Sequence, residues 1–62
     1  MQRAKVYFEL FVLGATVKVT AIDADSGCEA SIVGPATLPR AILEQAAIRK
    51  LEYVEKKRRG ET

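Results

Sequence analysis

The chain has 62 residues, a length that predicts a single domain over residues 1–62. Ten Lys and Arg residues stand against eight Asp and Glu residues, and this net charge of +2 is too small to predict a nucleic-acid partner from composition. One cysteine and no histidine exclude a disulfide within the chain and the commonest transition-metal ligand. No run approaches the roughly 18 apolar residues of a membrane span, so we expect a cytoplasmic protein without membrane contact.

Three stretches in the first half of the chain predict strands. Residues 5–13 are rich in β-branched and aromatic side chains, and residues 16–23 alternate apolar and polar side chains. Residues 28–33 follow a run of Asp, Ser and Gly that is typical of a turn. Residues 34–37 (Gly-Pro-Ala-Thr) are expected to end the sheet.

The turns predict the register between these strands. Residues 14–15 predict a type II′ hairpin turn because glycine stands first, and this turn pairs Val12 with Val17. A four-residue loop before Cys28 pairs Ala21 with Ala30. In this register one face of the sheet is wholly apolar, whereas a slip by one residue inverts the last strand.

A C-terminal helix is predicted over residues 38–59. Pro39 is expected in its first turn, with Thr37 or Leu38 as the cap, and Gly60 is expected to end it. A core-facing stripe at helical spacing is formed by Leu43, Ala47, Leu51 and Val54. The predicted fold is α+β, a three-stranded antiparallel meander followed by one helix.

Both layers have apolar side chains left over. A domain of this size buries only about 60% of its unfolded surface, so self-association is expected to add stability. We expect a homo-oligomer, a dimer or higher, and an unidentified protein partner is the other reading. The candidate interface consists of the surplus apolar residues of the second sheet face and the helix: Tyr7, Phe11, Leu13, Ile22, Val33, Ile42 and Tyr53.

No pattern of residues indicates catalysis, so we expect no enzyme, no cofactor and no metal. Cys28 lies on the predicted core face, which favours a packing role over a reactive thiol. The acidic run over residues 23–29 resembles the start of an EF-hand loop, but the glycine stands at its fifth position instead of its sixth. A hairpin turn explains this run better.

A basic run ends the predicted helix: Lys56, Lys57, Arg58 and Arg59. Cations in a last helical turn complement the helix dipole. The alternative function is a small nucleic-acid-binding protein in which this run contacts a polyanion. Because Val54 is the last apolar residue of the helix, residues 55–59 are expected to project beyond the core.

Four segments are similar to a known family: residues 21–23 (Ala-Ile-Asp), 26–29 (Ser-Gly-Cys-Glu), 31–36 (Ser-Ile-Val-Gly-Pro-Ala) and 49–54 (Arg-Lys-Leu-Glu-Tyr-Val). Over residues 6–56 the chain resembles a family of short alphaproteobacterial proteins, a domain of unknown function. The resemblance implies a bacterial cytoplasmic origin and brings no activity, cofactor or catalytic residue. Such chains are sometimes labelled serine hydroxymethyltransferase, but 62 residues leave little material for a pyridoxal phosphate pocket.

Overall fold

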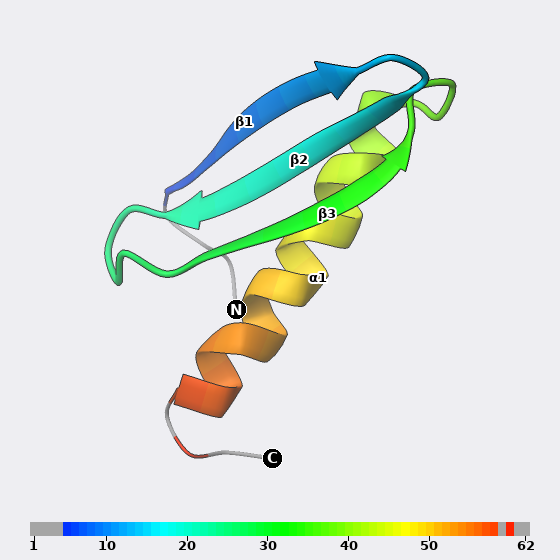
Figure 1. The fold of residues 1–62 in the computed structure, drawn as a ribbon. Helices are drawn as coiled ribbons and strands as arrows, with labels where there is room; N and C mark the ends of the chain where they lie inside the picture. The colour runs from blue at the N-terminus through cyan, green and yellow to red at the C-terminus, as the bar shows by residue number, and fades with distance from the viewer. Residues whose placement is uncertain (1–4, 59, 61–62) are drawn as a thin grey trace.

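The computed structural model describes residues 5–58 and residue 60. Three strands are followed by one helix: β1 (Val6–Leu13), β2 (Thr16–Asp23), β3 (Glu29–Pro35) and α1 (Arg40–Arg58). The strands form one antiparallel sheet in the order β1-β2-β3, and α1 lies on one face of it (Figure 1). The α+β meander with a C-terminal helix is therefore confirmed.

The two turns set the predicted register. Val12 pairs with Val17, and Ala21 pairs with Ala30. In the first turn Gly14 has a φ of +60°, whereas Ala15, like every other described residue that is not glycine, has no positive φ. A type II′ turn has a positive φ at its first central residue only, as found here. In the second turn the Asp23 carboxylate accepts the N–H of Asp25 at 2.9 Å, which makes the acidic run a hairpin turn.

The third strand runs further than predicted. Gly34 and Pro35 pair with Val17 and Thr16, so the expectation that residues 34–37 end the sheet is wrong for its first two residues. Proline is tolerated here because β3 is an edge strand and the Pro35 nitrogen faces away from β2. A Cβ at Gly34 would lie 2.6 Å from Leu43 Cδ2, so the glycine allows α1 to approach the sheet closely.

The helix begins at Arg40, two residues later than predicted. The Pro39 carbonyl accepts the first helical N–H groups, from Ile42 at 3.0 Å and Leu43 at 3.4 Å. Pro39 therefore takes the cap position that Thr37 or Leu38 was expected to hold, and Leu38 belongs to the preceding turn, where its N–H donates to the Pro35 carbonyl at 3.2 Å. At the other end Gly60 has a φ of +81° and donates to the Lys57 carbonyl.

The core lies between α1 and two of the three strands. Its buried apolar residues are Val17, Val19, Ala21, Cys28, Ala30, Leu43, Ala47 and Leu51. Leu10 and Val12 share the apolar face of this core but are exposed, so α1 covers only part of that face. A helix about 10 Å wide covers roughly two strands spaced about 4.8 Å apart, and α1 packs on β2 and β3.

Candidate interaction surface

Strand β1 exposes apolar side chains on both of its faces. On the outer face, turned away from α1, Tyr7, Phe11 and Leu13 are 58–60% exposed. On the inner face Leu10 is 38% and Val12 65% exposed. We call these five residues the β1 surface. They lie on one strand, but their side chains point to both faces of the sheet.

The outer face becomes more polar away from β1. Its register places Lys18 between Phe11 and Val33, and it places Thr20 between Glu9 and Ser31. The hydroxyl oxygens of Thr20 and Ser31 lie 2.7 Å apart. A shallow, open depression of about 590 Å³ reaches the β1 edge and is lined by Glu9, Leu10, Phe11, Lys18 and Thr20. Apolar surface is therefore concentrated along β1 and is not spread evenly over the sheet.

The seven residues of the predicted interface do not form one patch. Five lie on the outer face of the sheet: Tyr7, Phe11, Leu13, Ile22 and Val33. Ile42 and Tyr53 are exposed on a flank of α1 that also carries Lys50. The Lys50 ammonium donates to the Ser31 carbonyl at 2.8 Å, so this flank faces the edge formed by β3, opposite to β1.

The backbone of β1 offers unpaired groups at the edge of the sheet. Leu13 and Thr16 flank the two-residue turn and therefore exchange hydrogen bonds with each other. From Leu13 the pattern alternates, so odd-numbered residues bond with β2; the bond from Ala24 N–H to the Lys5 carbonyl agrees. The N–H and C=O groups of the even-numbered residues Phe8, Leu10 and Val12 consequently point away from the sheet.

The opposite edge is protected. In β3 the even-numbered residues bond with β2, as the bond from Asp23 N–H to the Cys28 carbonyl shows. Pro35 therefore faces outward and has no N–H to offer, and the outward carbonyl of Ser31 is taken by Lys50. These devices leave β1 as the open edge of the sheet.

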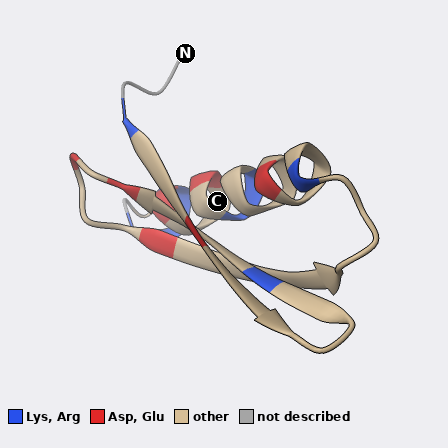
Figure 2. Cartoon of the chain, turned by 90° about the horizontal axis from the view of Figure 1, so that it is seen from above, with Lys and Arg blue, Asp and Glu red and all other residues tan. Residues whose placement is uncertain are grey.

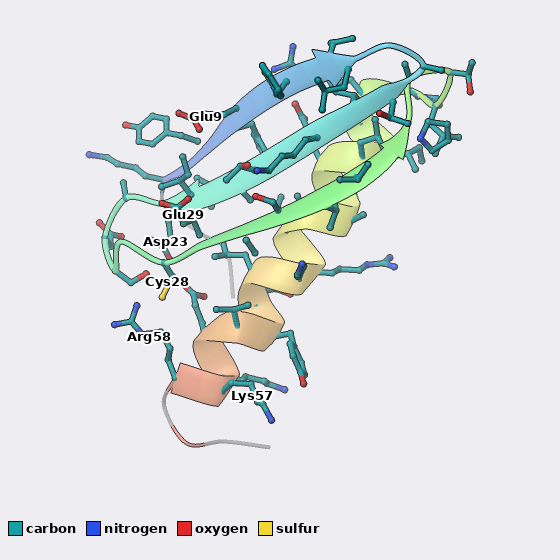
Figure 3. All side chains as sticks on the ribbon, in the orientation of Figure 1. Glu9, Asp23, Cys28, Glu29, Lys57 and Arg58 are labelled. Atoms are coloured by element: carbon teal, nitrogen blue, oxygen red, sulfur yellow. The ribbon has the colours of Figure 1, made fainter. Side chains whose placement is uncertain are left out.

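The basic end of α1 is partly engaged with the sheet. Arg58 Nη1 lies 2.9 Å from Cys28 Sγ, whereas Lys57 lies on another side of the helix, 5.8 Å from the centre of the Tyr53 ring (Figure 3). Glu55 is buried and accepts the Ser26 hydroxyl at 3.1 Å. The expectation that residues 55–59 project beyond the core is therefore wrong for Glu55, whereas Arg58 is exposed and reaches back to the sheet through its guanidinium.

The turn between β2 and β3 explains why the end of α1 contacts the sheet. This turn extends past the strand ends and reaches the last turns of α1 through Ser26 and Cys28. Lys56, Lys57 and Arg58 are exposed, and Arg59 lies outside the described residues. Figure 2 shows both basic and acidic residues along the helix, and the last turn of α1 carries the basic residues Lys56, Lys57 and Arg58.

Residues 5–58 and 60 contain no group of three or more His, Cys, Asp or Glu side chains that could hold a metal ion. Within the same residues, no helix is long and apolar enough to cross a membrane.

The fold and this surface define a small α+β domain with one open, apolar edge strand. A family model described as a domain of unknown function (DUF6898) matches residues 3–58, and the chain belongs to that family. Comparisons with curated proteins and with solved structures found no match. The family description brings no activity to the chain.

Proposed function

We propose that the domain is a homo-oligomeric protein-interaction module of the bacterial cytoplasm, without catalytic activity, in which a second copy of the chain covers β1. One observation carries this proposal: β1 is an edge strand with exposed apolar side chains on both faces and Glu9 as its one charged residue. Exposed edges of this kind pair readily with other strands, and folded proteins normally block them with lysine, proline or a bulge. β1 contains no lysine or proline, and its pairing with β2 is continuous.

The exposed area supports a second copy as the partner. Five large apolar side chains of β1 are 38–65% exposed: Tyr7, Leu10, Phe11, Val12 and Leu13. At about 200 Å² for a large side chain they present on the order of 550 Å², more than half of the roughly 800 Å² per partner of a standard interface. An edge strand is also complementary to its own copy, because a two-fold axis brings the same groups together.

The non-catalytic part of the proposal rests on the residues available. The chain has no histidine, and its one cysteine is buried against the guanidinium of Arg58. The competing function is nucleic-acid binding by the basic run, which is supported by the exposure of Lys56 and Lys57. Arg58 is directed to Cys28 instead, which weakens this alternative.

Light scattering coupled to size exclusion tests the proposal. At micromolar concentration the chain should have at least twice its mass of 6.8 kDa. Phe11→Glu should return the mass to that of one chain, because it places a carboxylate on the β1 surface. The matched control is Val33→Glu, on the same face but on β3, and it should keep the oligomer. A wild-type monomer with a Tm that does not depend on concentration contradicts the proposal.

A further inference from the structure

The open edge of β1 also indicates how two copies meet. We infer that β1 pairs antiparallel with β1 of a second copy about a two-fold axis at Leu10, so that two three-stranded sheets become one sheet of six strands. This inference rests on the proposed function and specifies the partner's strand and its register. Three features of β1 must fit the same register: its outward backbone groups, its side chains and its one charged residue, Glu9.

The backbone groups suit this pairing. Phe8, Leu10 and Val12 point their N–H and C=O groups away from β2, as the two-residue turn dictates. In an antiparallel pair, residues whose groups point at each other exchange both hydrogen bonds. With the axis at Leu10, Phe8 of one copy faces Val12 of the other, and the two Leu10 residues face each other. Every outward group of these residues then has a partner.

The side chains restrict the register to few choices. A two-fold axis perpendicular to the sheet runs between the two β1 strands and keeps outer residues opposite outer residues. It must therefore lie level with one residue of β1, the same residue in both copies. An axis at Glu9 aligns residues 6–12, and an axis at Leu10 aligns residues 7–13. Axes further along the strand align fewer residues and leave more of the apolar strand uncovered.

The charge of Glu9 decides between these two registers. With the axis at Glu9 the two carboxylates stand directly opposite each other in a closely spaced pair, with Cα atoms about 4.5 Å apart. Like charges directly opposite are destabilising. With the axis at Leu10, Glu9 faces Phe11 of the second copy. Lys18 of that second copy pairs with the same Phe11, one strand further from Glu9. Tyr7 then faces Leu13 of the second copy, an aromatic–aliphatic pair.

The pairing explains why both faces of β1 are apolar. In the six-stranded sheet β1 becomes a central strand, and both faces of a central strand have neighbouring side chains. Because the axis is perpendicular to the sheet, both copies of α1 lie on the same side. Strands spaced about 4.8 Å apart place the two helices roughly 19 Å from each other. The side chains of Phe8, Leu10 and Val12 from both copies line the floor between them.

Cysteine cross-linking reads the register directly. Each variant is made in a Cys28→Ala background and oxidised mildly at micromolar concentration. Leu10→Cys should form a covalent dimer in most of the protein, because the paired Cα atoms lie about 5.5 Å apart, within the disulfide range of about 4.4–6.8 Å. Glu9→Cys is the matched control; its Cα atoms would be about 8 Å apart, too far for a disulfide. Amide exchange provides a second measurement, with protection of Phe8, Leu10 and Val12 lost on dilution.

The outcomes separate this inference from the proposed function. Efficient linking by Glu9→Cys in place of Leu10→Cys overturns the register. A dimeric mass with neither variant linked, and with Phe8, Leu10 and Val12 exchanging freely, overturns the strand pairing and leaves self-association through another surface. A monomeric wild-type chain in light scattering overturns the proposed function itself.

Discussion

β1 and β3 are both edge strands, yet they present different groups to solvent. β3 lies over α1, and its outward edge has Pro35 without an N–H and a Ser31 carbonyl bound by Lys50. β1 lies beside the helix layer, and its outward edge offers the backbone groups of Phe8, Leu10 and Val12. The two strands are of similar length, so the difference lies in what covers and blocks each edge.

This comparison separates stability from association. The β3 side contributes most of the buried contacts, because α1 packs on β2 and β3. The β1 side adds little to the monomer's core and keeps its apolar surface exposed. Changes on the β3 side should therefore alter the free energy of unfolding, and changes on the β1 side should alter oligomeric mass.

The largest contrast is expected between two leucines. Leu51 is fully buried, so Leu51→Ala should lower the free energy of unfolding by about 2–5 kcal/mol, enough to unfold much of a domain this small. Leu10→Ala should cost less than about 1 kcal/mol because the side chain is already 38% exposed. Urea unfolding measures both, in a monomeric Phe11→Glu background that removes association from the result. Equal losses at the two positions would show that β1 belongs to the core.

The next contrast concerns added volume. Gly34→Val should destabilise the domain by about 1–3 kcal/mol, since even a Cβ at Gly34 would lie 2.6 Å from Leu43 Cδ2. Val12→Ile adds a methylene group on the same face of the sheet, where no helix covers it, and should leave the free energy of unfolding unchanged. Thermal unfolding of the two variants beside the wild type gives the comparison. A Gly34→Val protein as stable as wild type would mean that α1 can move away from β3 without loss.

A smaller effect is expected where β3 is blocked. Lys50→Ala removes the donor to the Ser31 carbonyl and should lower the free energy of unfolding by about 0.5–1.5 kcal/mol. It should also raise the tendency of the protein to associate at high concentration, since a second edge then lacks part of its protection. Arg49→Ala, one residue earlier and also exposed, is the control and should show neither change. Urea unfolding and light scattering over a concentration series measure the two effects; a Lys50→Ala protein that matches Arg49→Ala in both would remove Lys50 from this role.

The strand register could be predicted from the sequence because it depends on local rules. A two-residue turn with glycine first sets the pairing of Val12 with Val17, and the apolar alternation sets Ala21 against Ala30. The same turn also determines which backbone groups of β1 point outward, so the open edge at Leu10 could have been found from the sequence. That step requires counting from Leu13 along the strand and no knowledge of the helix.

The placement of α1 could not be predicted in the same way. The stripe of Leu43, Ala47 and Leu51 identifies the helix face that packs, but it does not say which two strands this face covers. The exposure of Val12 and the burial of Glu55 both depend on that choice. The contact between Arg58 and Cys28 joins residues 30 positions apart, across a turn whose reach no local pattern describes.

The smallest effect is expected at the exposed lysines. Replacing Lys56 and Lys57 with Gln should change the free energy of unfolding by less than about 0.5 kcal/mol, because dipole and surface charge interactions are weak at exposed sites. Arg58→Gln is the matched variant and should cost more, since Arg58 contacts the buried Cys28. The double lysine variant should also keep the wild-type mass in light scattering. The nucleic-acid alternative makes the opposite demand: wild type should bind RNA or DNA at about 50 mM salt, where phosphate contacts are strong, and the lysine variant should lose that binding. If the wild type does not bind at this salt concentration, the nucleic-acid alternative is rejected and association through the open edge of β1 is the function that is left.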